Sequence, residues 1–264
     1  MRLGILAALI ALLLPQIVTA TGLARLSDRE DLLGWEAVGR LDINGSGYCT
    51  GTLIAPDLVL TAAHCVYDRR HELLSPDQLL FRAGLQNGGT IAERQITRIV
   101  AMPDYRPGGG MTSDNIRNDV ALLQLAEPIS TTDADPFILH TGPASADISV
   151  TSYGEGRSDA PSRQRHCRVV GEQGDLIAFD CNVTFGSSGA PVFVQVGGRG
   201  RIFSIVSGGT TDGGQKIGFG MKLPAAVAEL KAQLRQPARA RNTTAPKRLQ
   251  IGNRSAGGAK FVRH

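Results

Sequence analysis

Three short segments carry side chains that could act together in nucleophilic chemistry. His64 stands in the run Thr61-Ala62-Ala63-His64-Cys65, at the end of a hydrophobic strand pattern. Asp119 stands at the head of an apolar run, and Ser188 lies in the glycine-rich segment 186–191. A serine hydroxyl becomes a good nucleophile when an imidazole takes its proton and a carboxylate fixes the tautomer of that imidazole. Backbone N–H groups of a glycine-rich loop can then hold an oxyanion.

Each segment also has an ordinary structural interpretation. A histidine at the end of a strand is more often structural, and an aspartate before a strand is usually a turn residue. A loop rich in glycine and serine is usually only a turn. The three segments therefore gain weight only in combination.

In combination, they resemble the histidine, aspartate and nucleophile motifs of the chymotrypsin/trypsin-like serine proteases. The matching runs are residues 61–65, 118–123 and 186–191, and the resemblance extends from about residue 39 to residue 230. The order His, Asp, Ser is that of this family, whereas an α/β-hydrolase has its serine first.

The resemblance implies a role for each residue of these motifs. Ser188 would attack the substrate carbonyl, His64 would act as base and then as acid, and Asp119 would orient His64. The N–H groups of Gly186 and Ser188 would form the oxyanion hole. No metal or other cofactor is expected, because no calcium loop, zinc set or phosphate loop is visible.

Substrate binding is implied for a second set of residues, which are Asn182, Ser207, Gly208, Gly209 and Gly218. Ser207 would also support Asp119, and the two glycines after it would pair with the substrate backbone by strand addition. Asn182 stands where trypsin has the aspartate that selects Arg and Lys. Val206 stands where a glutamate-selective enzyme carries histidine. We therefore expect cleavage after an uncharged residue.

Two departures from the family pattern concern activation. The family has an aspartate directly before the nucleophile, where this chain has Ser187. That aspartate receives a new N-terminus from a sequence like Arg-Ile-Val-Gly-Gly, and no such sequence occurs between Ala20 and Gly51. The stretch Arg40-Leu41, followed by the run at residues 49–54, resembles the glutamyl-endopeptidase-like branch, which also lacks that sequence. We expect competence once a signal peptide or a slightly longer pro-segment is removed.

The first 20 residues have the layout of a signal peptide. Arg2 precedes a twelve-residue apolar run, residues 3–14, and Val18-Thr19-Ala20 is a small-residue cleavage site. Twelve residues make about 18 Å of helix, too short to cross a bilayer. An N-terminal anchor or a buried helix is the alternative. We expect a secreted protein, periplasmic or extracellular.

In an exported protein, four cysteines indicate two disulfides. Cys49 and Cys65 flank a predicted turn at Pro56-Asp57, and Cys167 and Cys181 flank one at residues 173–175. Each pair would close the open end of a hairpin, where the chain ends are already neighbours. Free thiols or a metal site are the alternative, but neither pair has zinc-ligand spacing.

Charge separates the C-terminal tail from the rest of the chain. Residues 237–264 contain seven basic and no acidic side chains, whereas residues 21–236 contain 20 basic and 24 acidic ones. The tail lacks apolar periodicity, which predicts disorder. It is either a bland solvated tail or a tether to an anionic surface, with no specific nucleic acid expected.

The strand patterns and a terminal helical pattern predict an all-β double barrel or sandwich, and the resemblance implies two six-stranded antiparallel β-barrels of chymotrypsin type with a C-terminal helix. The composition of the 264-residue chain, with 32 glycines, 13 prolines and 42% hydrophobic residues, excludes the classes of disordered proteins and coiled coils. After the signal peptide we expect an N-terminal segment over 21–38, which could include a short pro-segment. The protease domain would cover 39–236, with barrels over about 39–130 and 145–222 and a helix over 223–236.

The sequence thus predicts a secreted, monomeric serine endopeptidase that acts on polypeptides through an acyl-enzyme intermediate. The alternative is a catalytically silent homologue that uses the same scaffold, and its basic tail, as a binding module. Such homologues usually lose a residue of the triad, and here all three are present. An active enzyme that prefers ester or peptidoglycan-type substrates is a third interpretation.

Overall fold

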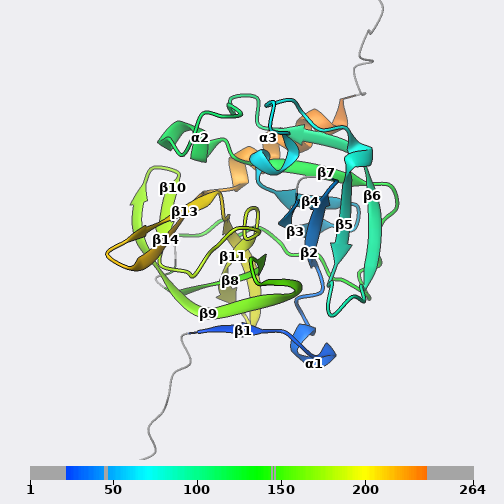
Figure 1. The fold of residues 1–264 in the computed structure, drawn as a ribbon, viewed down its shortest axis with the longest axis horizontal. Coiled ribbons are helices and arrows are strands. Elements are labelled where there is room, and N and C mark those ends of the chain that lie inside the picture. The colour runs from blue at the N-terminus through cyan, green and yellow to red at the C-terminus, as the bar shows by residue number, and fades with distance from the viewer. Residues whose placement is uncertain (1–21, 45–46, 144, 146, 237–264) are drawn as a thin grey trace, which may run out of the picture.

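Two groups of antiparallel strands form the body of the molecule, and they lie side by side in this computed structural model (Figure 1). The structure describes residues 22–236, apart from 45–46, 144 and 146. The predicted signal peptide over 1–20 and the predicted tail over 237–264 lie outside the described residues.

The first group closes into a barrel with the strand order β2-β3-β4-β7-β6-β5. Side chains such as Leu41, Leu53 and Phe81 point into it and are fully buried. The turn between the second and third strands falls at Pro56-Asp57, as the sequence predicts. The six strands are β2 (Val38–Ile43), β3 (Gly47–Ala55), β4 (Leu58–Thr61), β5 (Leu79–Ala83), β6 (Ala92–Ala101) and β7 (Ala121–Leu125).

The second group is one sheet of eight strands, with the order β12-β11-β8-β9-β10-β14-β13 and β1 paired to β9. The two ends of this path, β12 and β13, follow each other in the chain with only Val206 and Ser207 between them, so the strands run around a second barrel of the expected chymotrypsin type. The 17-residue β9 pairs with β8, β10 and, off the path, β1. The strands are β1 (Leu23–Arg25), β8 (Asp147–Gly154), β9 (Arg157–Gln173), β10 (Leu176–Phe179), β11 (Pro191–Val196), β12 (Arg199–Ile205), β13 (Gly208–Asp212) and β14 (Gln215–Met221).

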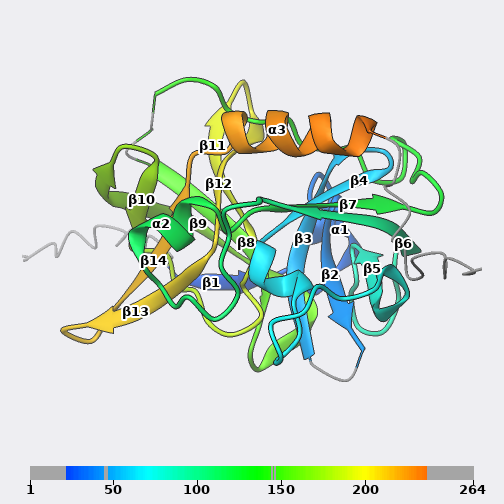
Figure 2. The same cartoon turned by 90° about the horizontal axis from the view of Figure 1, so that it is seen from above.

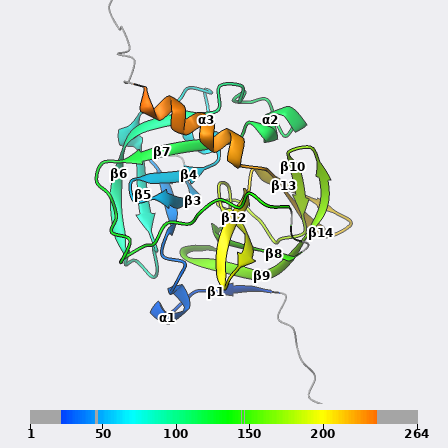
Figure 3. The ribbon, with the colours of Figure 1, turned by 180° about the vertical axis from the view of Figure 1, so that it is seen from behind.

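Helices are few and short, apart from the last. The predicted C-terminal helix is α3 (Pro224–Arg235), with its proline in the first turn, where no N–H is needed. It buries Val227 and Leu230 and contacts β6 and β7, so it lies across the back of the first barrel (Figures 2 and 3). The others are α1 (Arg29–Leu32) and α2 (Ser113–Arg117), with 3₁₀ turns η1 (Ala63–Val66) and η2 (Pro76–Gln78). No helix in the described part of the chain is long and apolar enough to span a membrane. These elements confirm the all-β class with a C-terminal helix.

The segment over residues 127–143, between the two strand groups, is part of the packed body. Phe137 is buried, and its N–H donates to the carbonyl of Leu53 in the first barrel at 2.9 Å. Two residues later, Leu139 pairs with Ile202 of the second sheet in a parallel bridge. The segment therefore joins the two strand groups through hydrogen bonds to both.

Candidate active site

His64 and Asp119 meet at the junction of the two strand groups. The sequence places His64 at the end of a strand, and in the structure it lies just after β4, on the 3₁₀ turn η1. Asp119 lies two residues before β7. Asp119 is 3% exposed, and its Oδ1 accepts the backbone N–H of His64 at 2.8 Å. Its Oδ2 lies 2.8 Å from Nδ1 of His64. When Nδ1 carries the proton that this contact requires, Nε2 is free to accept another.

Ser207 completes the surroundings of the buried carboxylate. It lies between β12 and β13, and its Oγ donates to Oδ2 of Asp119 at 2.5 Å. Three hydrogen bonds therefore satisfy Asp119, two from His64 and one from Ser207. A carboxylate held in this way fixes the orientation of the imidazole.

The same carboxylate changes the proton affinity of His64. Burial lowers the pKa of the imidazole, but the charge of Asp119 and the hydrogen bond to it raise the pKa more. The net result is a pKa above the ordinary value of 6.5. An imidazole tuned in this direction is a stronger base, as a proton acceptor from serine requires.

Ser188 lies in the tight loop between β10 and β11, which is anchored on the first barrel. The N–H of Thr50 on β3 donates to the carbonyl of Ser188 at 2.8 Å, and its Oγ1 donates to the carbonyl of Gly186 at 2.8 Å. Ser188 and His64 line one cavity of about 600 Å³. The loop thus faces the imidazole across a shared space.

Close packing explains the glycine after the serine. Gly189 has a φ of +75°, and a Cβ there would lie 2.8 Å from the backbone nitrogen of Ala62 and against the carbonyl of Thr50. No other residue fits both the conformation and the space.

The backbone N–H groups of Gly186 and Ser188 have no hydrogen-bond acceptor among the described residues. The direction of the first is fixed by its own peptide plane. The carbonyl of Phe185 accepts the N–H of Glu155 at 2.8 Å, and no described peptide bond is cis. In a trans peptide the C=O and N–H point in opposite directions, so the N–H of Gly186 points away from Glu155. Two free, oriented donors beside a serine suit an oxyanion.

A second cavity, of about 390 Å³, adjoins Ser188. Its described lining contains no aspartate or glutamate, and its cation, Lys216, is exposed. The lining is Met111, Val183, Thr184, Phe185, Ser188, Val206, Ser207, Gly208, Gly209, Thr210, Thr211 and Lys216. Of the sequence-predicted binding residues, Ser207, Gly208 and Gly209 are in this set.

The structure does not bring Asn182 and Gly218 to this cavity. The side chain of Asn182 is exposed, while its backbone N–H donates to Oε1 of Gln164 at 2.7 Å. Gly218 packs against the ring of Phe179, where a Cβ would lie 2.8 Å from Cδ2. The walls at this end of the cavity are instead formed by Val183 and Thr184.

Gly208 and Gly209 begin β13, which stands at the end of the strand order of its sheet. In the described part of the chain β13 pairs with β14 and with no other strand. One edge of its backbone is therefore open beside Ser188, which is the geometry that strand addition needs.

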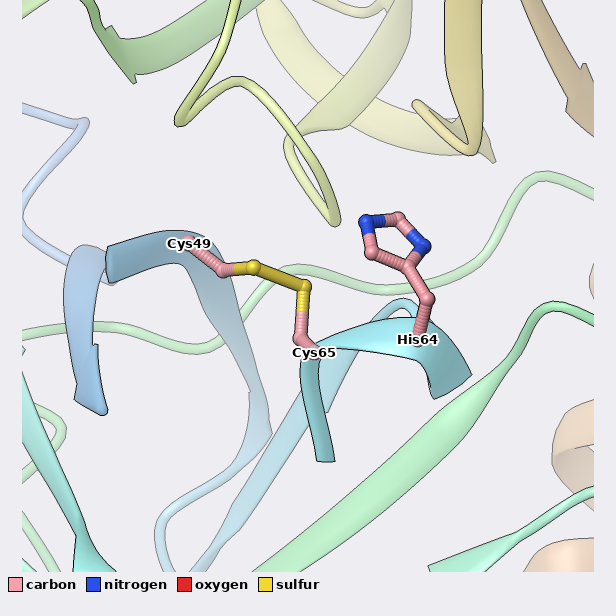
Figure 4. A group of neighbouring side chains, drawn as sticks. All are labelled: Cys49, His64 and Cys65. Carbon is pink, nitrogen blue, oxygen red and sulfur yellow. A yellow bond between two sulfur atoms is a disulfide. The ribbon is translucent and has the colours of Figure 1, made fainter. Parts of the chain in front are cut away.

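Two disulfides join Cys49 to Cys65 and Cys167 to Cys181, the pairs that the sequence spacing favours. Figure 4 shows the imidazole of His64 beside the first of them. Cys49, His64 and Cys65 offer ligand atoms within 4.8 Å of one another. Because both sulfurs are bonded to each other, neither is a thiolate, and the group does not fit a metal ion.

Sequence reasoning missed three residues that shape the site. Thr50 anchors the serine loop, and the ring of Tyr48 packs under Gly186, where a Cβ would lie 2.8 Å from Cζ. Phe185 is 83% exposed and lines both cavities beside Ser188. Thr50 directly follows Cys49, a signal that could have marked it. The large exposed aromatic at 185 has no signal in one sequence.

Comparison with known proteins agrees with this geometry. The family model described as Trypsin matches residues 33–228. Serine protease 56 of Mus musculus is 33% identical over 142 residues, which cover 51% of this chain and 22% of that protein. Trypsin Blo t 3 of Blomia tropicalis is 29% identical over 158 residues, 56% of this chain and 53% of that protein.

The chain thus spans about a fifth of the length of the first curated relatives. Among solved structures, a Glu endopeptidase superimposes with a TM-score of 0.64 at 20% sequence identity, covering 81% of this chain and 96% of that chain. At that identity, the likeness concerns the fold.

Proposed function

Because the chain belongs to the trypsin family of serine proteases, we propose that it is a serine endopeptidase whose nucleophile is Ser188. The observation that carries the proposal is the hydrogen-bonded series from Ser207 through Asp119 to His64, next to the cavity that His64 shares with Ser188. A buried, fully satisfied carboxylate behind a basic imidazole serves proton transfer to and from a nucleophile.

In the acylation step, Ser188 gives its hydroxyl proton to Nε2 of His64 as its Oγ bonds to the substrate carbonyl carbon. The carbonyl oxygen becomes an oxyanion, which the N–H groups of Gly186 and Ser188 receive. Each such donor stabilises the transition state by about 3–4 kcal/mol. His64 then protonates the leaving amine, the C–N bond breaks, and the acyl group stays on Ser188.

In the deacylation step, a water gives its proton to His64 and its oxygen attacks the acyl carbon. The second oxyanion forms in the same place as the first, so the same two N–H groups serve both steps. Collapse of this intermediate returns the proton from His64 to Ser188 and releases the acid. Asp119 keeps the imidazole in one tautomer throughout.

Cleavage after an uncharged residue is the specificity that the second cavity supports. A substrate strand along β13 would place the side chain before the scissile bond in the space lined by Val183, Thr184 and Val206. A Lys or Arg side chain there would meet no carboxylate of the described lining. An acidic side chain would lose its hydration to an apolar wall, since the ammonium of Lys216 is exposed to solvent.

Export from the cell is the second part of the proposal. The two disulfides and the signal-peptide pattern of residues 1–20 support it, because disulfides persist in oxidising compartments. The protein recovered outside the cytoplasm should begin directly after Ala20, the cleavage site that the sequence predicts. Recovery of an uncleaved chain would contradict export through this signal.

A peptide-library digest tests the activity and the specificity together. The wild-type protein and Ser188→Ala are incubated with the library, and the products are identified by mass spectrometry. We expect internal cleavage by the wild type alone, mainly after uncharged residues. Cleavage mainly after Arg, Lys or Glu would contradict the specificity. A wild-type protein with both disulfides and no cleavage would support the silent homologue instead.

A further inference from the structure

Arg157 is a partly buried cation without a carboxylate. It is the first residue of β9, directly after the tight turn at Glu155-Gly156 that joins β8 to β9. Among the described residues, no aspartate or glutamate lies within ion-pair distance of its guanidinium. Burial lowers the pKa of this guanidinium, so the site is unfavourable for its charge. An unpaired, partly buried charge costs stability and calls for an explanation.

The guanidinium is directed at the serine loop. Its Nη1 donates to the carbonyl of Ser152 on β8 at 2.9 Å and to Oγ of Ser152 at 3.2 Å. Its Nη2 donates to Oγ of Ser187 at 3.4 Å. Ser152 thus holds one arm of the guanidinium while the other reaches the residue before the nucleophile.

Ser187 is the fully buried centre of that loop. Its hydroxyl lies 3.1 Å from Oγ of Ser152 and accepts the N–H of Thr184 at 3.3 Å. Its own N–H donates to the carbonyl of Thr184 at 2.9 Å, and its carbonyl accepts from Ala190 at 2.9 Å. The peptides on either side of Ser187 lead to the two N–H groups assigned to the oxyanion.

The same β8–β9 turn also fixes the other side of the loop. Glu155 donates its N–H to the carbonyl of Phe185, which sets the direction of the N–H of Gly186. Glu155 and Arg157 are two residues apart and bond to Phe185 and Ser187, which are also two residues apart. The turn therefore binds the loop on both sides of Gly186, at Phe185 and at Ser187.

We propose that Arg157 is a positioning residue, whose guanidinium holds Ser187 and thereby keeps the N–H groups of Gly186 and Ser188 in place for the oxyanion. This inference rests on the proposed function. It explains how the loop is ordered in a chain that has serine, and no carboxylate, at position 187. The positive charge that orders the loop is then internal, and activity does not depend on the α-amino group of a particular N-terminal residue.

The titratable groups around Arg157 allow its role to be tested by varying the pH. Tyr48 on β3 is a titratable group whose charge would affect Arg157, and burial raises the pKa of this phenol above the ordinary 10.0. Arg40 on β2 bonds to the carbonyl of Ser158, and Glu155 is exposed in the turn. With its pKa raised, the phenol of Tyr48 stays neutral between pH 7.5 and 9.5, and a guanidinium stays charged over this range.

Replacement by lysine makes the ordering charge titratable. An ammonium group has an ordinary pKa of about 10.4, which desolvation in this site lowers. We expect Arg157→Lys to keep a substantial part of kcat at pH 7.5 and to lose it at least about fivefold by pH 9.5. The wild type and the control Arg165→Ala, which changes an exposed arginine on the same strand, should show no loss of kcat over this range.

Removal of the side chain tests the size of the effect. We expect Arg157→Ala to lower kcat about 10²-fold with a smaller change in KM, because a misplaced oxyanion hole acts mainly on the transition state. Adding Ser187→Ala should lower kcat little further if Arg157 acts through Ser187. Circular dichroism and the melting temperature of each variant show whether the fold is retained.

The outcomes separate this inference from the proposed function. If the Arg157→Lys variant is folded and its kcat varies between pH 7.5 and 9.5 as that of the wild type does, the inference is overturned and the proposed function stands. An Arg157→Ala variant with an unchanged kcat has the same consequence. A wild-type protein without activity overturns both. If Arg157→Ala does not fold, the pH profile of Arg157→Lys decides.

Discussion

At the residue scale, the site is built around Asp119. This carboxylate is buried and accepts hydrogen bonds from the backbone and ring of His64 and from Ser207. The three residues come from distant parts of the chain, and the sequence motifs mark all of them. What the motifs do not reveal is that the backbone of His64 also binds Asp119, which fixes η1 as well as the ring.

The raised pKa of His64 predicts the pH dependence of activity. The imidazole must be neutral to accept the proton of Ser188, so kcat/KM should rise with pH with an apparent pKa above 6.5. The stability of the fold has the opposite sign. A pKa raised by folding stabilises the protein fully below 6.5, and this contribution is lost as the pH rises through the raised value.

An NMR titration of His64 in the Ser188→Ala protein measures that pKa without turnover. Asp119→Asn in the same background should move the pKa of His64 down, because the attracting charge is gone. If the pKa of His64 is the same with and without Asp119→Asn, the assignment of the shift to Asp119 is wrong.

Gly189 predicts a second, steric effect at this scale. Gly189→Ala should abolish activity and destabilise the fold, because its Cβ would overlap the backbone of Thr50 and Ala62 as well as strain a φ of +75°. Gly174→Ala is the matched control, with a φ of +63° and nothing within 4 Å of the added Cβ. It should cost about 1 kcal/mol and leave activity intact. Chemical denaturation and peptide hydrolysis measure the two quantities, and equal effects would contradict a special role for position 189.

At the scale of elements, the sequence predicts the strands that apolar runs mark and misses those that no such run marks. The strands β4 and β7, for example, lie within apolar runs of the sequence. The long β9 has no apolar alternation and contains Pro161, so no periodicity marks it. The position of Arg157 beside the serine loop and the pairing of β1 both depend on β9, so neither could be predicted from the sequence.

The two disulfides should contribute equally to stability but differently to catalysis, because each one holds a different part of the site. They close loops of similar length, with sequence separations of 16 and 14, so removing either pair by Cys→Ala should cost a similar amount, about 3 kcal/mol. Their effects on catalysis should differ. Cys65 is next to His64 in η1, whereas Cys181 leads into the cavity wall at Val183 and Thr184.

Steady-state kinetics of the two double variants separates these roles. We expect loss of the Cys49–Cys65 bond to act mainly on kcat and loss of the Cys167–Cys181 bond to act mainly on KM. The reverse pattern would show that the elements do not position the site as described.

At the scale of the whole molecule, one hydrophobic cluster joins the two strand groups, and a second cluster lies within the second sheet. The main cluster of buried side chains includes Leu53 and Phe81 of the first barrel together with Tyr153, Phe193 and Ile205 of the second sheet. The site lies where the groups meet, with His64 and Asp119 from one and Ser188 and Ser207 from the other. Its geometry therefore depends on how the groups pack, which a division of the sequence into two barrels does not describe.

The single tryptophan of the chain reports on this packing. Trp35 lies 5.7 Å from the ring of Phe137 and 5.2 Å from that of Phe193, with the guanidinium of Arg163 4.1 Å above it. Because the main cluster is shared by the two groups, unfolding followed by Trp35 fluorescence and by far-UV circular dichroism should coincide. Phe193→Ala should lower stability by about 3–5 kcal/mol and keep the two curves together. Two separate transitions in the wild type would contradict a shared cluster.

The central claim, that Ser188 is a nucleophile activated by His64 and Asp119, is tested most directly by the intact mass of the protein after exposure to a fluorophosphonate probe. The probe reacts only with a serine that has a working base and oxyanion hole. The account predicts one adduct on the wild type with both disulfides formed, and none on Ser188→Ala. The absence of an adduct on such a wild-type protein, or an adduct that persists in Ser188→Ala, would contradict it.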